Sequence, residues 1–297
     1  MILLAGGTGM LGKQVLPLLT GQRLKLRILT SDPGRAPELE SDLVEVVSGD
    51  VRDPDSLTPA LAGVQTVISA MTGYDGRRGA TPRSVDAEGN RNLIKAAEAA
   101  KVEHFVLVSM HGAASDHPTE IAQMKFAAEH ELKKSRLTWT IIRPTAYMET
   151  WAMVIAEPLL KKGKALVFGR GQNPINFVST RDVARFVELA VTDSAMHGAT
   201  VDVGGPENLT LNQFVDTFAS VTGGGEGRTR IPRPMMQLLR VLMRPTNPTR
   251  ARMISDALAM DTSDFTFDSS ARGRSFPTIP LTSLAEAVRL AYVDRSC

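Results

Sequence analysis

Near the start of the chain, residues 2–12 read Ile-Leu-Leu-Ala-Gly-Gly-Thr-Gly-Met-Leu-Gly, which is the most informative segment for predicting the fold. An apolar run typical of a strand leads into the glycines, and an apolar helical pattern follows as far as Leu19. The spacing Gly7-x-Gly9-x-x-Gly12 fits a dinucleotide fingerprint, whose glycines permit a tight turn, close approach of a pyrophosphate and close helix packing. The N–H groups and dipole at a helix N-terminus favour an anion. The stretch therefore predicts a strand, a phosphate-binding turn and a helix.

The amino-acid composition is typical of a globular protein. It has 297 residues, of which 43% are hydrophobic and 22% charged, enough for a large core domain with a smaller lobe. The net charge of +2 gives no reason to expect nucleic acid as a partner. Cys297 is the only cysteine, which excludes an intrachain disulfide and fits a reducing compartment. With no apolar run of about 18 residues and a strand that begins at residue 2, we expect a cytoplasmic protein without a signal peptide or membrane span.

The first half of the chain alternates strand and helix patterns. This alternation predicts an α/β fold with a doubly wound parallel sheet, a Rossmann architecture, in which ligands bind beyond the carboxyl ends of the strands. Helices are expected at Ser84–Ala100 and Glu120–Lys134. The further expected strands are Leu24–Thr30, Leu43–Ser48, Thr66–Ala70, His104–Ser109 and Leu137–Arg143.

The pattern loosens after Thr145, which suggests a change of domain. We expect residues 1–150 to form the dinucleotide-binding core, with 165–203 partly rejoining it. Residues 204–297, together with 151–164, are expected to form a smaller C-terminal lobe that binds substrate. Within the second half, Tyr147–Lys162 has a helical pattern, and Ala165–Phe168 and Ile175–Val178 read as short strands.

Joined to later motifs, the glycine stretch resembles the NmrA-like, atypical branch of the extended short-chain dehydrogenase/reductase superfamily. The resemblance spans residues 1 to about 205 in the family's order and implies an NAD(P)-binding Rossmann fold. The matching pieces are AGGTGMLG at 5–12, GDVRDPDSL at 49–57, FVLVSMHGA at 105–113, MKFAAEHEL at 124–132, TIIRPTAYMET at 140–150 and FVSTRDVA at 177–184.

The resemblance implies which residues hold the cofactor. Asp50 and Val51 are implied at the adenine, Ala70 and Met71 on the adenosine side, and Lys125 at the nicotinamide ribose. The residues implied at the pyrophosphate are Gly6, Thr8, Gly9, Met10 and Leu11, and those implied near the nicotinamide are Pro144, Thr145, Ala146 and Tyr147.

The choice between NADP and NAD depends on the residues after the second strand. Asp32 lies where a carboxylate would bond a ribose 2′-hydroxyl, which favours NAD, or it is a turn initiator before Pro33. Thr30 and Ser31 can instead donate to a 2′-phosphate, with Arg35 in reach. One charge-assisted hydrogen bond contributes roughly 1.5–3 kcal/mol. We favour NADP and keep NAD as the alternative.

One departure from the family pattern bears on catalysis. Members with ordinary dehydrogenase chemistry have Tyr-x-x-x-Lys, and here Lys125 is preceded at that spacing by Ile121, which has no proton to donate. Lys125 is the expected functional residue, since a lysine there orients the ribose. Its alternative is a solvated lysine paired with Glu129 at i+4.

Three other side chains are candidates for catalysis, each with an ordinary alternative. Ser109 ends a strand and either contacts substrate or nicotinamide or caps the next turn. His111 either supplies a proton near neutral pH or is simply exposed. Tyr147 either replaces the missing acid or packs on Trp151 on one helix face, which we favour. The histidines have no metal-binding spacing, so no metal site is expected.

We therefore expect an NAD(P)H-dependent oxidoreductase that transfers hydride to a small apolar acceptor such as a quinone. The alternative is a non-catalytic NAD(P)-binding redox sensor that regulates a protein partner, and a nucleotide-sugar epimerase or dehydratase ranks lower because it needs the missing tyrosine. Two segments stay open. Residues 235–244 form a helix packed inside the small lobe, which we favour, or a helix for a protein partner or a membrane surface, or a flexible wall for an apolar substrate. Loop 73–83, with Arg77, Arg78 and Arg83, either closes over phosphates or forms a mobile surface loop. For the chain as a whole, a protein partner or a homodimer stays open.

Overall fold

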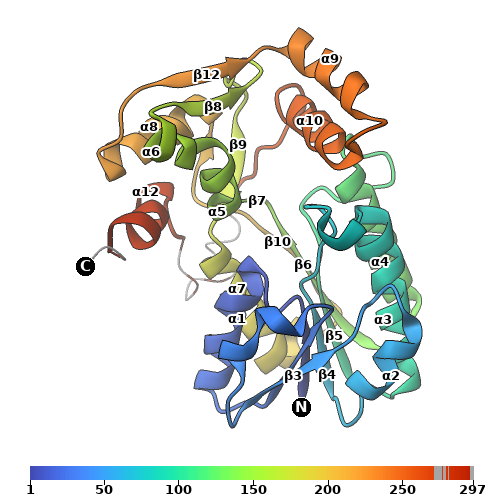
Figure 1. Ribbon diagram of the computed structural model, residues 1–297. Coiled ribbons are helices and arrows are strands. Elements are labelled where there is room, and N and C mark those ends of the chain that lie inside the picture. The colour runs from blue at the N-terminus through green and yellow to red at the C-terminus, as the bar shows by residue number, and fades with distance from the viewer. Residues whose placement is uncertain (271–275, 277–278, 280, 295–297) are drawn as a thin grey trace. The chain divides into compact units, whose positions relative to one another are not determined.

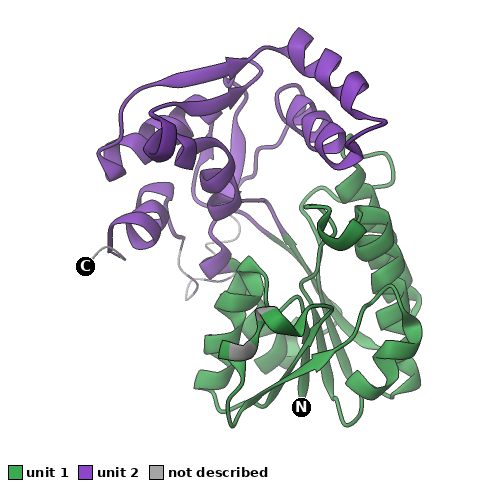
Figure 2. Cartoon of the chain, viewed as in Figure 1, with its two compact units in different colours: residues 1–143, 183–202 green, residues 144–182, 203–297 purple. Residues whose placement is uncertain are grey.

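The computed structural model describes residues 1–270, 276, 279 and 281–294, apart from the side chains of Arg35 and Pro37. Cys297 therefore lies outside the described residues. The side chain of Arg35, predicted to be in reach of a 2′-phosphate, also lies outside the described part of the chain. The chain divides into two compact units, shown in Figure 2. Unit 1 is Met1–Arg143 with Val183–Asp202, and unit 2 is Pro144–Asp182 with Val203–Cys297.

Unit 1 is built on a seven-stranded sheet whose order is β10-β6-β5-β4-β1-β2-β3. The strand pairings from β3 to β6 are all parallel, which confirms the predicted doubly wound α/β class. The order reverses between β1 and β4, and such a reversal opens a crevice for ligands at the carboxyl ends of the strands. The strands are β1 (Ile2–Ala5), β2 (Leu26–Thr30), β3 (Val44–Ser48), β4 (Thr66–Ser69), β5 (His104–Val108), β6 (Thr138–Pro144) and β10 (Thr200–Val203).

Helices cover both faces of this sheet, as crossovers between parallel strands require. Figure 1 shows α1 and α7 on one face and α2, α3 and α4 on the other. Strand β5 is buried along its whole length, as expected for a strand covered on both faces. The helices are α1 (Met10–Gly21), α2 (Leu57–Ala60), α3 (Glu88–Ala99), α4 (Glu120–Lys134) and α7 (Thr180–Thr192), and a π-helical turn, η5 (Pro82–Ala87), leads into α3.

Unit 2 has two small sheets. One has the order β11-β9-β7 and the other pairs β12 with β8. We expected part of 165–203 to return to the large sheet, and from that range β10 does so, whereas β8 and β9 pair within unit 2. The strands are β7 (Ala146–Tyr147), β8 (Ala165–Phe168), β9 (Ile175–Val178), β11 (Asn208–Leu209) and β12 (Arg228–Ile231).

The helices of unit 2 surround a core rich in aromatic side chains, where Phe177 meets Phe214 edge to face at 4.9 Å. The predicted helix Tyr147–Lys162 is broken into α5, a π-helical turn and α6, and Tyr147 itself belongs to β7. The helices are α5 (Met148–Trp151), α6 (Glu157–Lys162), α8 (Leu211–Thr222), α9 (Arg233–Met243), α10 (Pro248–Met260) and α12 (Leu284–Val288), with the π-helical turn η6 (Ala152–Ala156). Over the described residues, every helix is too short or too polar to cross a bilayer.

Candidate functional site

The glycine turn between β1 and α1 has a shape that only glycine permits. Gly6 has φ +92°, and a Cβ on it would lie 2.6 Å from the Ala70 carbonyl oxygen. A Cβ on Gly12 would lie 2.4 Å from the Gly6 oxygen. The two residues thus bring the turn against the end of β4 and the helix against the turn. The predicted strand, turn and helix are confirmed.

Gly9 is the N-cap of α1, and no side-chain cap bonds this end of the helix among the described residues. A Cβ on Gly9 would meet only the Gly6 oxygen, at 3.1 Å. A larger residue would therefore clash less at position 9 than at position 12. A glycine that leaves space in front of an uncapped helix N-terminus fits a phosphate cradle. The residues present therefore suit a dinucleotide. Leu11 is buried, so only its backbone can face a ligand.

The end of β2 is contacted by a residue distant in sequence. Arg78 Nη1 donates to the Ser31 carbonyl oxygen at 2.7 Å and lies 3.5 Å from Asp32 Oδ2. Thr30 is nearly buried, and its hydroxyl accepts from the Asp32 backbone N–H at 3.1 Å. Loop 73–83 therefore lies against the predicted adenosine end of the crevice. The Arg78 carbonyl oxygen in turn accepts from Arg52 Nη1 at 3.0 Å.

The residues implied at the adenine are held by their neighbours. Asp50 accepts from Arg52 Nε at 3.0 Å and Nη2 at 2.6 Å, a two-point contact. The Arg52 guanidinium, bonded to this carboxyl, holds the pKa of Asp50 below its usual value. Val51 is buried, and its carbonyl oxygen accepts from Asn92 at 2.9 Å.

Lys125 is buried rather than solvated. Its ammonium lies 3.0 Å from Asp86 Oδ1, 2.9 Å from the Met71 oxygen and 3.0 Å from the Val108 oxygen. Two backbone carbonyls thus accept hydrogen bonds from the ammonium, and the Asp86 carboxylate balances its charge as an ion pair. The alternative of a solvated lysine paired with Glu129 is wrong. Its place on the nicotinamide ribose stays a prediction.

Glu129 has other partners. It accepts from Ser109 Oγ at 2.5 Å and from Arg143 Nε at 2.8 Å and Nη2 at 2.5 Å. Glu129 and Ser109 are buried. The Ser109 hydroxyl is thus oriented by a carboxylate that Arg143 neutralises, and its proton is directed at Glu129 rather than at the next turn. The carboxylate also holds the pKa of Arg143 above its usual value.

His111 follows β5 and is half-buried. Its Nδ1 lies 2.7 Å from Asp202 Oδ1, so the simply exposed histidine of the alternative is not what the structure has. An ionised carboxylate only accepts, so Nδ1 carries the hydrogen and Asp202 orients the ring. Burial lowers the pKa of His117.

Three charged residues were missed by sequence reasoning: Asp86, Arg143 and Asp202. Asp86 had a detectable signal, because it lies on the buried face of a helix pattern with Asn90 four residues later. A buried carboxylate requires a cation, and Lys125 was the candidate. Asp202 and Arg143 lie on strands β10 and β6, where their spacing to His111 and Glu129 depends on the sheet. No local signal identifies them.

The residues implied near the nicotinamide, from Pro144 to Tyr147, end β6 and form β7, and all four belong to unit 2. Tyr147 pairs in register with Val178 of β9, so the expected shared helix face with Trp151 is wrong. Trp151 instead meets Phe177 edge to face at 6.3 Å. Burial raises the pKa of Tyr147, which keeps its phenol protonated. Thr145 Oγ1 donates to Asn176 at 2.9 Å.

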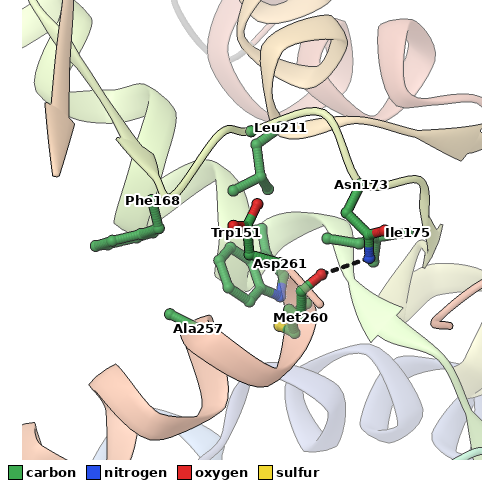
Figure 3. A pocket seen from close by; sticks show the side chains of 9 residues that line it. Trp151, Phe168, Asn173, Ile175, Leu211, Ala257, Met260 and Asp261 are labelled. Atoms are coloured by element: carbon green, nitrogen blue, oxygen red, sulfur yellow. Dashed lines mark hydrogen bonds between the residues drawn. The ribbon is translucent and has the colours of Figure 1, made fainter. Parts of the chain in front are cut away.

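Unit 2 contains a small pocket, shown in Figure 3. Asn173 donates to the Met260 carbonyl oxygen across one side at 2.6 Å. The cavity of about 10 Å³ has room for about one water molecule, far less than a quinone ring needs. Its lining residues are Trp151, Phe168, Gly171, Asn173, Ile175, Leu211, Ala257, Met260 and Asp261.

Helix α9 covers most of the segment whose packing was left open. Met236 is its only buried residue, whereas Met235, Leu238, Val241 and Leu242 are each at least half exposed. The interpretation of residues 235–244 as a helix packed inside the small lobe is therefore wrong for most of its apolar side chains. Among the described residues, no group of three side chains is arranged to hold a metal ion.

Known proteins are similar to this chain in sequence and in fold. The family described as NAD(P)H-binding matches residues 6–194. An NAD(P)H azoreductase from Xenophilus azovorans is 30% identical over 224 residues, which are 75% of this chain and 74% of that protein. The photosystem II assembly factor Ycf39 of Synechocystis sp. is 28% identical over 244 residues, 82% of this chain and 74% of the relative.

Two solved structures show the same fold over nearly the whole chain. The NADPH-dependent quinone oxidoreductase of Escherichia coli, complexed with NADPH, has a TM-score of 0.79 at 23% identity and covers 98% of this chain and 100% of its own. The Citrobacter sp. triphenylmethane reductase complexed with NADP(H) has a TM-score of 0.78 at 19% identity, with the same coverage. The family match and the shared fold confirm the predicted NAD(P)-binding Rossmann fold.

Proposed function

We propose that this chain, which belongs to the NAD(P)H-binding family, is an NADPH-dependent reductase. Its substrate would be a small apolar acceptor such as a quinone. The observation that carries the proposal is the uncapped N-terminus of α1 behind Gly9, where the strand order reverses. The azoreductase relative supports a reductive reaction on an apolar aromatic compound. We place the protein in the cytoplasm, since its one cysteine suits a reducing compartment.

Bound in unit 1, the dinucleotide would supply a hydride to the acceptor. The pyrophosphate would be held by the backbone from Gly6 to Leu11, and the adenine would lie beside Asp50 and Val51. On the nicotinamide side, Lys125 fixes the carbonyl groups that end β4 and β5, because its ammonium bonds Met71 and Val108. We propose that this contact shapes the wall on which the ribose rests.

Reduction of a quinone takes up one hydride and one proton. We assign the proton to His111, whose ring Asp202 orients. Ser109, which donates its one proton to Glu129, helps to order the end of β5 from which His111 follows. A reduced quinone also accepts a proton from water, so a missing tyrosine at Ile121 does not prevent turnover. His111 should therefore accelerate the reaction rather than be indispensable for it.

The test follows NADPH oxidation by its absorbance, with and without a benzoquinone acceptor. We expect acceptor-dependent turnover in the wild type. In His111→Gln, kcat should be roughly tenfold to thousandfold lower, because the variant loses the rate acceleration that general acid catalysis contributes. Asp202→Asn should lower kcat in the same direction. If the wild type binds NADPH but oxidises it no faster with any of a panel of quinones and azo dyes, the reductase proposal is wrong.

A second candidate is a redox sensor that binds NAD(P) without turnover. Ile121 favours it, as do the contacts that hold the Lys125 ammonium within the protein: two hydrogen bonds to backbone carbonyls and an ion pair with Asp86. The Ycf39 relative, an assembly factor by its name, supports a role with a protein partner. Retention of one partner from a lysate by the NADPH-bound protein but not by the NADP⁺-bound protein, without turnover, would favour this candidate.

A further inference from the structure

We propose that Arg78, on the loop after β4, is the residue that recognises the 2′-phosphate of NADP(H). This inference rests on the proposed function and names the specificity determinant of its cofactor site. Among the arginines of loop 73–83, Arg78 is the one placed on the end of β2. In doubly wound folds the adenosine ribose lies at this strand end, so a guanidinium here faces the 2′ position.

The contact is to backbone as well as to a carboxylate. Arg78 Nη1 donates to the Ser31 carbonyl oxygen at 2.7 Å, which fixes the guanidinium beside the strand end. The same nitrogen lies 3.5 Å from Asp32 Oδ2. A guanidinium has five N–H donors in a planar fork, and the Arg78 side chain is 57% exposed. The contact to Ser31 leaves part of the fork to bond phosphate oxygens.

The backbone of Arg78 is held in an uncommon conformation. Its φ of +53° and ψ of +34° lie in the left-handed region, which costs a non-glycine residue free energy. Arg52 secures it by donating to the Arg78 carbonyl oxygen at 3.0 Å, and Arg52 is itself fixed on Asp50. Three strand-end segments, after β2, β3 and β4, are therefore joined through Arg52 and Arg78. These contacts hold the Arg78 side chain beside the end of β2.

The charges at the end of β2 explain why the presence of Asp32 does not make NAD the preferred cofactor. A carboxylate alone at the end of β2 would repel a 2′-phosphate, which carries nearly two negative charges near neutral pH. The Arg78 guanidinium next to Asp32 offsets that charge and adds donors that a phosphate can use. The pair therefore favours NADPH, although Asp32 in isolation predicts NADH. Asp32 becomes the residue that orients the guanidinium.

The test compares the dissociation constants of NADPH and NADH, measured by calorimetry, in the wild type and in Arg78→Gly. Glycine accepts the left-handed backbone, so this variant removes the guanidinium without adding strain. Arg77→Gly is the matched control, because Arg77 is the exposed neighbour that pairs with Asp75. We expect Arg78→Gly to weaken NADPH binding about tenfold to hundredfold and to change NADH binding less than twofold.

Each other result has a distinct meaning. Equal weakening of both cofactors would make Arg78 a loop support and overturn the inference, as would unchanged NADPH binding or an equal effect of Arg77→Gly. A wild type that binds neither cofactor would overturn the proposed function itself. Arg78→Lys provides a second variant: it keeps the charge without the fork, and we expect its preference for NADPH to lie between those of wild type and Arg78→Gly.

Discussion

The ammonium of Lys125 lies 3.0 Å from the carboxylate of Asp86, and both side chains are almost completely buried. The pair joins α4 to the π-helical turn η5 and reaches the ends of β4 and β5 through two carbonyl groups. A lysine that the family pattern places on the cofactor is thus also a structural element of unit 1. Its removal should therefore change stability as well as cofactor binding.

Lys125→Met leaves the Asp86 carboxylate buried without its cation. Breaking one partner of a buried ion pair costs about 3–5 kcal/mol, so the free energy of unfolding should fall by that amount. The double variant Asp86→Asn with Lys125→Met should recover a large part of the loss, because no buried charge remains. Urea unfolding of the two single variants and the double variant measures the coupling. Additive losses would contradict the pair.

Two glycines of the turn should respond differently to alanine. A Cβ on Gly12 would lie 2.4 Å from the Gly6 oxygen, so Gly12→Ala should lower the free energy of unfolding by about 1–3 kcal/mol or more. Gly9 has φ −80° and meets only one atom at 3.1 Å, so Gly9→Ala should cost less than about 1 kcal/mol. Gly9→Ala should nevertheless weaken NADPH binding. Thermal unfolding and calorimetry on both variants separate the packing role of Gly12 from the binding role of Gly9. If Gly9→Ala binds NADPH as tightly as the wild type does, the phosphate does not bind at this turn.

Local patterns predicted most of unit 1. The helix expected at Glu120–Lys134 is α4 with the same bounds, and the strand expected at Leu43–Ser48 is β3, one residue shorter. Apolar periodicity and caps act within a few residues, so a single sequence contains them. The glycine turn was predictable for the same reason.

What the sequence could not predict depends on distant partners. Tyr147 reads as helical, yet it pairs with Val178, and a two-residue strand has no pattern of its own. Glu129 lies four residues after Lys125 on one helix, yet it forms its ion pair with Arg143 on β6. Arg78 reaches Ser31 only because loop 73–83 folds back across strand ends. Each outcome is set by tertiary contacts rather than by local propensity.

His104 should make stability depend on pH. Burial and the neighbouring His197 lower the pKa of His104 to about 4 from its usual value of 6.5. The unfolded chain then binds the proton more tightly, so stability is full above about pH 6.5 and falls as the pH drops towards about 4. The loss should be about 2–3 kcal/mol at pH 4.5. Urea unfolding at pH 7 and 4.5 checks this, with His104→Gln as the control that keeps a donor for Thr140. Equal losses in both proteins would rule His104 out as the cause.

Two residues of α9 test the exposure of its apolar face. Met236 is 1% exposed and Leu238 is 59% exposed. Met236→Ala should therefore lower the free energy of unfolding by about 2–5 kcal/mol, whereas Leu238→Ala should change it by less than about 0.5 kcal/mol. Thermal unfolding of the two variants at several protein concentrations makes the comparison. A large, concentration-dependent effect of Leu238→Ala would mean that this face is covered by another copy of the chain.

We propose that unit 1 binds a dinucleotide at the N-terminus of α1, with its adenosine end at β2. This binding is measured by calorimetric titration of cofactor-free protein with NADPH and, separately, with NADH. We predict one site per chain with a micromolar or lower dissociation constant for NADPH and at least tenfold weaker binding of NADH. Tighter binding of NADH would place Asp32 on the ribose and reverse the assignment of Arg78, and no binding of either would contradict the account.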